Sequence, residues 1–348
     1  MNRLLLITPD FSPNTGGVAR YLGLLASYFQ GRLRVISSTS ELLSSFIWPH
    51  WLKTVLLLLR LRREHDLVMT SHILPFGTAT LIASWLTKKP YIIFVHGMDV
   101  RLACTTIKKK WIASFVLKHA RVVVANSNAL SQEIAELFHV PLPLVVYPCV
   151  DSSSDRSLKP IAQSQIKPFI FLTVSRLVSR KGHVAVLSVL AHLKQSEDFP
   201  VFEYHIVGSG PMEETLKEMV SQLNLSEVVF FGTLSDEELE QQYASADLFV
   251  MPVIDDPVDK EGFGTVFLEA ARFGVPSIST RISGIEEAIL DGKTGILIPP
   301  RDQLALQKAI LELVLSPEER MRLGNNARAR VFQEFTAEKQ FSKLEAYV

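Results

Sequence analysis

Short apolar runs alternate with longer helical patterns in two series along this 348-residue chain. The runs of the first series are 4–8, 34–37, 67–70, 91–95, 122–125 and 144–147, and those of the second are 169–174, 204–207, 228–231, 248–251, 276–279 and 295–298. Neighbouring parallel strands need a crossover that is usually a helix, so this alternation is typical of βαβ units. The sequence therefore predicts an α/β protein with two doubly wound, mostly parallel sheets.

A polar segment, 151–168, separates the two series, because it is rich in Ser, Pro and charge and has no apolar periodicity. Such a composition is typical of a linker. We expect an N-terminal Rossmann-like domain over 1–150 and a C-terminal one over 169–333. The final helix, 334–348, is expected to cross back onto the first domain. Two domains also suit the length, at roughly 100 to 200 residues per domain.

The composition is that of an ordinary globular protein, with 47% hydrophobic and 21% charged residues, and it excludes disordered and fibrous classes. Two cysteines, Cys104 and Cys149, are too few for a disulfide framework or a four-ligand zinc site, which favours a reducing compartment. The N-terminal apolar run, Leu4–Ile7, is shorter than the roughly 7 to 15 residues of a signal-peptide core. We therefore expect a buried first strand and a cytoplasmic protein.

Charge is distributed unevenly, although the formal net charge is zero. Residues 1–150 contain 16 basic and 7 acidic side chains, a net of +9, and residues 151–348 have a net of −9. A basic half favours an anionic partner, such as a membrane surface, a nucleic acid or a phosphorylated substrate. Two solvated surfaces of different composition would give the same count.

The most apolar stretch, 46–63, is interrupted by Pro49, Lys53 and Arg60 and is too short to span a bilayer. It suits a membrane interface, with Trp48, Trp51 and leucine side chains buried and basic side chains near lipid phosphates. A helix packed on the sheet with a basic C-terminal end explains the pattern equally well. A second basic and aromatic segment, Lys108-Lys109-Lys110-Trp111, begins another helix. A peripheral position on an anionic membrane is therefore one expectation.

Candidate binding residues lie at strand ends, where open parallel sheets bind their ligands, and we expect the two sheets to share a cleft. Gly16 and Gly17 follow the first strand and open a helix, where backbone amides can approach a phosphate or a sugar closely. His96 directly follows the strand 91–95. The chain contains neither a Gly-x-Gly-x-x-Gly fingerprint nor a P-loop, which argues against a dinucleotide-binding or P-loop enzyme.

Two further patterns stand out in the second half. Arg176 and Lys181 follow the strand 169–174, and a planar guanidinium with a compact ammonium suits a pyrophosphate. Glu261 and Glu269 flank a glycine-rich loop and the first turns of an apolar helix, where a carboxylate needs donors such as ribose hydroxyls. The alternatives are a solvated basic turn and two carboxylates that only stabilise the helix dipole or face solvent.

Together these motifs, Gly16-Gly17, His96-Gly97, Ser175-Arg176 with Lys181-Gly182, and Glu261-x7-Glu269, resemble the retaining glycosyltransferases of family 4. That family has the GT-B fold, in which two Rossmann-like domains face a central cleft. The stretch 291–297, Asp-Gly-Lys-Thr-Gly-Ile-Leu, also resembles a recurrent segment of the family's second domain. The resemblance is dense over 169–300 and sparse but ordered in the first domain.

The resemblance implies a role for each motif. Arg176 and Lys181 would bind the donor pyrophosphate, Glu269 the ribose and Glu261 the sugar hydroxyls. His96 would contact a hydroxyl at the far side of the sugar as a positioning or electrostatic group. The other implied donor-binding residues are Gly16 and Gly17 at the phosphate or acceptor, Gly208 and Leu234 at the base, and Phe263, Gly264, Thr265 and Val266 at the distal phosphate.

The sequence departs from the family pattern at 282–287, where relatives often have a Gly-Gly-x-Pro-Glu turn. An acidic insertion, 255–260, precedes Glu261 and suggests either a metal site or a solvated loop. It contains no Asp-x-Asp triplet, and Arg176 and Lys181 already neutralise the donor phosphates. We therefore expect a solvated loop, no metal and no other cofactor.

The leading hypothesis is a retaining hexosyltransferase that uses a nucleotide-sugar such as a GDP- or UDP-hexose. Its expected acceptor is a glycan, a lipid-linked sugar or a small molecule, in cell-surface polysaccharide or glycolipid synthesis, with no nucleic-acid partner. Catalysis would come from positioning and from electrostatic stabilisation of the leaving diphosphate. The rival hypotheses are a nucleotide-sugar epimerase of similar fold and a non-catalytic GT-B partner subunit.

Overall fold

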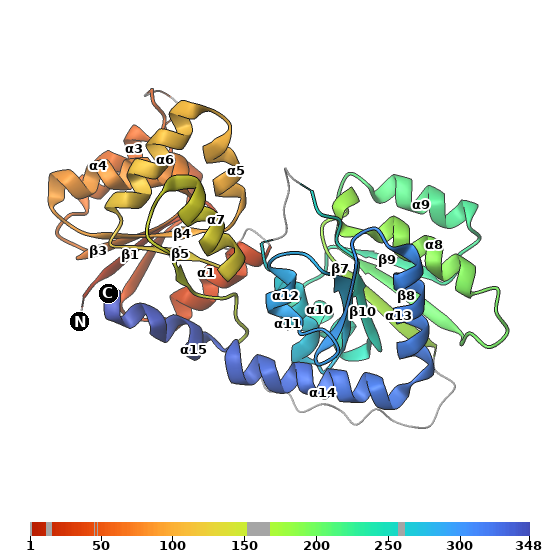
Figure 1. Cartoon of the computed structure of the whole chain (residues 1–348). Helices are drawn as coiled ribbons and strands as arrows, with labels where there is room; N and C mark the ends of the chain where they lie inside the picture. The colour runs from red at the N-terminus through yellow and green to blue at the C-terminus, as the bar shows by residue number, and fades with distance from the viewer. Residues whose placement is uncertain (1, 12–15, 45, 47, 152–167, 257–261) are drawn as a thin grey trace. The chain divides into compact units, whose positions relative to one another are not determined.

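A computed structural model of the chain describes residues 2–11, 16–44, 46, 48–151, 168–256 and 262–348. The chain divides into two compact units (Figure 1). The N-terminal unit comprises 1–151 together with 335–348, and the C-terminal unit comprises 152–334. The last residues of the chain thus belong to the same unit as the first.

A six-stranded parallel sheet forms the centre of the N-terminal unit as described. Its strands are β1 (Leu4–Ile7), β2 (Leu33–Ile36), β3 (Leu67–Ser71), β4 (Tyr91–Val95), β5 (Val122–Ala125) and β6 (Leu144–Val145). Their order across the sheet is β2-β1-β3-β4-β5-β6. The order reverses between β1 and β3, and such a switch point is where ligands of these sheets bind.

Helices cover both faces of this sheet. They are α1 (Gly17–Tyr28), α2 (Thr39–Leu42), α3 (Leu52–Arg60), α4 (Thr78–Thr87), α5 (Met98–Cys104), α6 (Ile107–His119), α7 (Asn128–Phe138) and α15 (Ala337–Phe341). Successive residues of β1 point to opposite faces, so that Leu5 and Ile7 pack with α3, α4 and α6, whereas Leu4 and Leu6 pack with α1 and α15. Figure 1 shows the same two layers of helices.

The described residues of the C-terminal unit also form a six-stranded parallel sheet. Its strands are β7 (Phe169–Val174), β8 (Phe202–Val207), β9 (Val228–Gly232), β10 (Leu248–Met251), β11 (Ser277–Thr280) and β12 (Gly295–Ile298). Its helices are α8 (His183–Leu193), α9 (Glu213–Gln222), α10 (Asp236–Ser245), α11 (Thr265–Arg272), α12 (Ile285–Ala288), α13 (Gln303–Leu315) and α14 (Pro317–Glu334). The order β12-β11-β10-β7-β8-β9 is that of a Rossmann sheet, with its switch point between β7 and β10.

The predicted α/β fold with two doubly wound sheets is confirmed, and each apolar run of the two series forms a strand in the described residues. The segment 46–63 was expected either at a membrane interface or as a helix packed on the sheet, and the structure describes it except for residue 47. It is helical over α3, and Trp51 packs against the core of the N-terminal unit instead of facing outward. At the other end of the chain, α15 packs against α1. Every described helix is too short or too polar to cross a bilayer.

Candidate active site

The turn after β7 lies at the switch point of the C-terminal sheet, beside the end of β10. Gly182, with φ of +77°, precedes α8 at this turn, and a Cβ there would lie 2.1 Å from the carbonyl oxygen of Pro252. The backbone N–H of Ile254 donates a 2.7 Å hydrogen bond to the carbonyl of Arg180. The segment after β10 is therefore fitted closely against the turn 179–182, which requires a glycine at 182.

Three cationic residues lie on this turn and just before it. Arg176 is exposed, whereas Arg180 and Lys181 are buried. Charge that is shielded from solvent attracts an anion more strongly than charge on an open surface. The structure thus brings Arg176 and Lys181 to one loop and adds Arg180. Sequence reasoning gave Arg180 no role, although it is part of the same basic motif.

A buried hydrogen-bond network supports the loop from beneath. Oγ of Ser175 lies 3.0 Å from Nε2 of His183, and Nδ1 of His183 lies 3.4 Å from the hydroxyl of Tyr204. That hydroxyl lies 2.8 Å from Oγ1 of Thr173. Burial, and secondarily the charge of Lys181, lower the pKa of His183 to about 4, so its imidazole is neutral at neutral pH. The network fixes both ends of the loop that carries the cations, and the sequence did not point to it.

Two glycines bring the loop after β8 against the loop after β7. A Cβ on Gly208 would lie 2.0 Å from the carbonyl oxygen of Ser175, and one on Gly210 would lie 2.5 Å from that of Leu177. Such close approach of two backbones is possible only without side chains. Leu234 is half-buried in the loop after β9, the next strand of the sheet. The residues expected to line the base therefore follow neighbouring strands.

The segment 263–266 forms the start of α11. Phe263 is buried, and Gly264 adopts a φ of +83° immediately before the first helical residue, Thr265. Thr265 and Val266 are both half-buried. The free amides of a helix N-terminus favour an anion, which agrees with the phosphate contact that the family resemblance implies.

Glu269 lies in the second turn of α11 and is half-buried. Its Oε2 accepts a 2.7 Å hydrogen bond from the hydroxyl of Tyr243 on α10. The sequence led us to expect ligand hydroxyls as donors, and the structure adds a protein donor that the sequence did not single out. Glu261, the expected partner of the sugar hydroxyls, lies outside the described residues, as does Asp259 of the acidic insertion.

In the N-terminal unit, the loops after β1 and β3 meet at the switch point. Nε2 of His72 lies 3.2 Å from the carboxylate of Asp10. His72 has φ of +76°, which is uncommon for a residue with a side chain and is found preferentially at functional sites. In the loop after β1, Gly16 with φ of +131° precedes α1, whose first residue is Gly17. A Cβ on Gly16 would contact nothing within 4 Å among the described residues.

His96 follows β4 at the same edge of that sheet. Its backbone N–H donates a 2.9 Å hydrogen bond to the buried carboxylate of Asp99, whose other oxygen lies 3.8 Å from Nε2 of His72. Burial raises the pKa of Asp99, an effect that the nearby His72 opposes. Burial, and then the charge of His72, lower the pKa of His96 to about 3, so its imidazole is neutral at neutral pH. The sequence gave no role to His72 or Asp99, although both follow strand ends.

The remaining motifs have structural roles. In the turn 291–297, the carboxylate of Asp291 accepts a 2.8 Å hydrogen bond from the N–H of Leu297 and pairs with Arg281 at 2.5 Å. In the divergent segment 282–287, Gly284 with φ of +89° immediately precedes α12. The described residues contain no group of three or more His, Cys, Asp or Glu side chains that could hold a metal ion.

Comparisons with known proteins agree with this arrangement. A family model described as glycosyl transferases group 1 matches residues 155–330, and one described as glycosyltransferase family 4 matches residues 15–154. The chain is 30% identical to a GDP-mannose-dependent α-(1-6)-phosphatidylinositol monomannoside mannosyltransferase of Mycolicibacterium smegmatis, over 92% of this chain and 91% of that protein. It is 25% identical to an N-acetyl-α-D-glucosaminyl L-malate synthase of Bacillus anthracis, over 82% and 74%. The crystal structure of Anabaena HepE in complex with UDP-glucose is similar in fold, with a TM-score of 0.79 at 20% identity over 99% of each chain.

Proposed function

The chain belongs to the glycosyl transferases group 1 family and is a glycosyltransferase, and from that premise we propose that it is a retaining hexosyltransferase. It transfers a hexose from a nucleoside-diphosphate sugar to a glycan, a lipid-linked sugar or a small molecule. The first donor to test is GDP-mannose, because the Mycolicibacterium relative uses it. UDP-glucose is the second, because it is bound in the Anabaena structure.

The observation that supports this proposal best is the group of side chains at the switch point of the C-terminal sheet. Arg176 and Lys181 provide positive charge on the loop after β7, and Glu269 provides a carboxylate on α11. The positive charge suits a diphosphate, and the carboxylate suits the hydroxyl groups of a ribose. A nucleoside diphosphate combines these two groups in one small molecule.

The proposed mechanism relies on charge and position. In a retaining transfer, the acceptor hydroxyl enters on the face from which the diphosphate leaves. The bond from the sugar to the diphosphate oxygen breaks, the bond to the acceptor oxygen forms, and the acceptor proton goes to the leaving diphosphate. Arg176 and Lys181 stabilise the negative charge that builds on the leaving group. The neutral imidazole of His96 orients the sugar and is not a nucleophile.

We propose further that transfer requires no divalent metal, since the cations of the loop after β7 do the work of a metal ion at the diphosphate. Full loss of activity with a chelator, restored by Mg²⁺ or Mn²⁺, would contradict this part. A modest stimulation by a metal would not, because free metal also screens the charge of the nucleotide-sugar.

The test of function is product analysis with purified protein, GDP-mannose or UDP-glucose, and a membrane lipid extract as acceptor. We expect release of nucleoside diphosphate together with a new glycosylated lipid whose anomeric configuration matches that of the donor. An epimerase would instead convert the donor into an epimeric nucleotide-sugar without consuming an acceptor. A non-catalytic subunit would release no nucleotide from any donor, although a thermal shift could still report binding.

A further inference from the structure

A strip of aromatic side chains lies on the outer face of α4 and α6. The ring of Trp111 stacks on Phe115 with their centroids 5.7 Å apart, and Phe115 in turn contacts Trp85 of α4 at 5.6 Å and His119 at 4.3 Å. Trp111 is 68% exposed and Trp85 is 48% exposed. We call Trp85, Trp111, Phe115 and His119 the aromatic strip. It joins two helices in a single apolar surface open to solvent.

Lysines bracket the aromatic strip on α6. At 100° per residue, Lys108 and Lys118 fall with the three α6 members of the strip within an arc of about 100°. Both lysines are exposed, and neither forms an ion pair with a carboxylate in the described part of the chain. The face therefore combines exposed rings with uncompensated positive charge.

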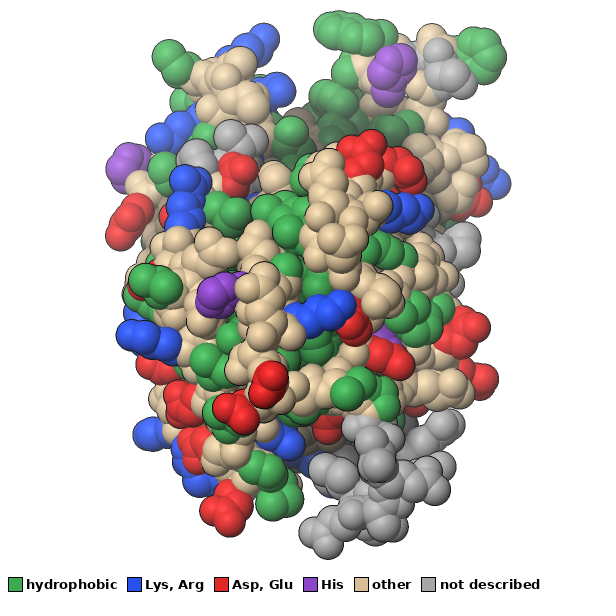
Figure 2. All heavy atoms as spheres, turned by 90° about the vertical axis from the view of Figure 1, so that its right-hand side faces the viewer, with side chains coloured by type: hydrophobic (Ala, Val, Ile, Leu, Met, Phe, Trp, Pro, Cys, Tyr) green, Lys and Arg blue, Asp and Glu red, His purple; other side chains and the backbone are tan. Residues whose placement is uncertain are grey.

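The whole helical layer shares this charge. The helices α3, α4 and α6, which pack side by side over one face of the sheet, contain six Lys and Arg residues and no Asp or Glu. Figure 2, which looks onto the C-terminal unit, shows acidic and basic side chains interspersed instead. The positive balance of the first 150 residues is thus concentrated in part on this layer.

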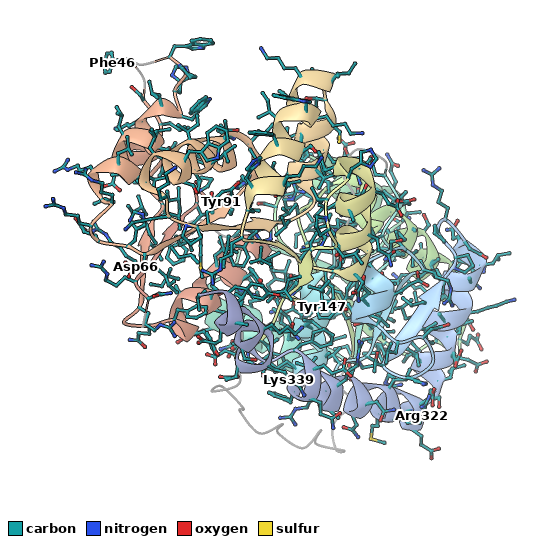
Figure 3. The ribbon with its side chains drawn as sticks, turned by 60° about the vertical axis from the view of Figure 1, so that its left-hand side comes forward. Phe46, Asp66, Tyr91, Tyr147, Arg322 and Lys339 are labelled. Atoms are coloured by element: carbon teal, nitrogen blue, oxygen red, sulfur yellow. The ribbon has the colours of Figure 1, made fainter. Side chains whose placement is uncertain are left out.

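A second exposed apolar element precedes α3. Phe46 and Trp48 are 98% and 84% exposed, and Figure 3 shows Phe46 standing clear of the body of the N-terminal unit. Exposed apolar side chains that are close together, unlike ones scattered singly, often mark an interaction site. Trp51, by contrast, is half-buried and packs against the core of the N-terminal unit.

We infer that the aromatic strip, with Lys108 and Lys118, binds an anionic lipid bilayer, and that the exposed Phe46 and Trp48 of the same unit also insert into it. The partner is a bilayer because Trp side chains and flanking lysines suit the headgroup region, where rings are half-immersed and ammonium groups meet lipid phosphates. Under the proposed function, this docking would bring the enzyme to a lipid-linked acceptor in the bilayer. Binding to the bilayer does not itself require that the protein transfer a sugar.

The test uses the full chain with vesicles of phosphatidylcholine, with and without phosphatidylglycerol. All four tryptophans, residues 48, 51, 85 and 111, lie in the N-terminal unit, so intrinsic fluorescence reports on this surface. Vesicles with brominated acyl chains should quench emission when they contain phosphatidylglycerol and not when they lack it. Substituting Trp48, Trp85 or Trp111 singly by Phe should each remove part of the quenching, whereas Trp51→Phe should not.

Lysine substitutions test the electrostatic part. At about 1 kcal/mol for each cation near an anionic surface, Lys108→Gln and Lys118→Gln should each weaken vesicle binding about fivefold, and the pair about 25-fold. A matched control on α13 of the C-terminal unit, Leu304→Ser with Lys308→Gln, changes an exposed apolar and an exposed basic residue and should leave binding unchanged. Raising the salt concentration should weaken vesicle binding by the parental protein but leave a residual association through the aromatic rings.

Three results would overturn the inference. The first is the absence of quenching by anionic vesicles at low salt. The second is equal binding by the lysine variants and the parental protein. The third is a dimer in sedimentation velocity that Trp111→Ser converts to monomer, because the aromatic strip would then be an interface between copies of the chain.

Binding of nucleoside diphosphates, measured by calorimetry on the same preparations, separates this inference from the proposed function. If the chain binds anionic vesicles but no nucleoside diphosphate, the proposed function fails and the docking stands. If it binds nucleotide but ignores vesicles, the docking fails and the proposed function stands.

Discussion

The hydroxyl of Tyr243 donates a 2.7 Å hydrogen bond to Oε2 of Glu269 and so ties α10 to α11 in the C-terminal unit. Tyr243 is itself buried, with its ring stacked on Phe273 at 5.9 Å. A carboxylate held by a rigid donor loses less conformational freedom when it binds a ligand. This pair therefore holds the Glu269 carboxylate in a fixed position at α11, which suits the hydroxyl-binding role proposed for it.

We expect Glu269→Ala to weaken binding of a nucleoside diphosphate by about 10-fold or more, since hydrogen bonds to a charged group contribute roughly 1.5 to 3 kcal/mol. Tyr243→Phe should cause a smaller loss, because it only frees the carboxylate. Inorganic pyrophosphate, measured by calorimetry alongside, should bind both variants as it binds the parental protein. Equal losses for pyrophosphate and nucleotide would show that Glu269 does not contact the ribose.

The matched control for this pair is Glu240→Ala. Glu240 is another carboxylate between the same two helices, and it pairs with Arg272 at 3.2 Å. If its loss weakens nucleotide binding as much as the loss of Glu269, then helix packing and not ribose recognition explains both effects.

Arg176→Ala and Lys181→Ala should each reduce kcat/KM for the donor by about 10-fold or more, because each removes a charge-assisted contact with the diphosphate. Because the two side chains differ in solvent exposure, the melting temperature should distinguish the two variants. Arg176 is exposed and its loss should leave the melting temperature unchanged, whereas Lys181 is buried and its loss should lower it. Near-parental turnover of both variants at limiting donor would exclude the pyrophosphate assignment.

The sequence predicted the position of the strands but not their order in each sheet. Alternating apolar runs predicted each strand correctly, because a parallel sheet buried on both faces leaves a continuous apolar signal, as in β4. The order of strands across each sheet was not predicted, since it depends on which loops cross and not on local composition. The sequence left open whether Trp51 faces a membrane or packs on the sheet, because periodicity alone does not tell which apolar positions of 46–63 meet the core. In the structure, Trp51 is half-buried and packs against that core.

The residues of the candidate site also include some that the sequence indicated and some that it did not. Arg176, Lys181 and Glu269 were predicted as site residues because charged residues at strand ends or in apolar helices stand out against their surroundings. Tyr243, His72 and His183 were missed, since each is an ordinary residue in its own segment. They acquire a role only when folding places them beside Glu269, Asp10 or Ser175. Long-range contacts of this kind leave no trace in local sequence.

The buried imidazole of His183 predicts a pH dependence of stability. Its pKa is about 4 in the folded chain and 6.5 by default in the unfolded one. Above pH 6.5 the imidazole is neutral in both states and does not make the free energy of unfolding depend on pH. Between these values the unfolded chain binds the proton and the folded chain does not, so falling pH favours unfolding by up to about 3 kcal/mol.

Hydrogen exchange of the β7 and α8 amides at pH 7 and pH 5 measures this effect locally. Protection should fall at pH 5 in the parental chain and fall less in His183→Gln, whose amide can still meet Ser175. His192→Gln, at an exposed position of the same helix, is the control and should behave as the parental chain does. An identical pH response of all three proteins would show that His183 is not the source.

Gly208→Ala tests the close approach of the two loops at the proposed nucleotide site. The new methyl group would lie 2.0 Å from the carbonyl oxygen of Ser175, in backbone that cannot yield without displacing Arg176, the next residue. Gly232→Ala is the matched control, because Gly232 also has a positive φ, of +64°, but its Cβ would meet no described atom within 4 Å. Gly232→Ala incurs the modest strain of a left-handed alanine, and Gly208→Ala, with φ of +122° outside that region, incurs more. Only Gly208→Ala should also weaken binding of a nucleoside diphosphate in calorimetry, by about 10-fold or more, since a shift of about 1 Å in a binding group is enough to lose its contacts. If the two variants bind nucleotide equally well, the loop after β7 does not position the cations in the way its contact with Gly208 implies.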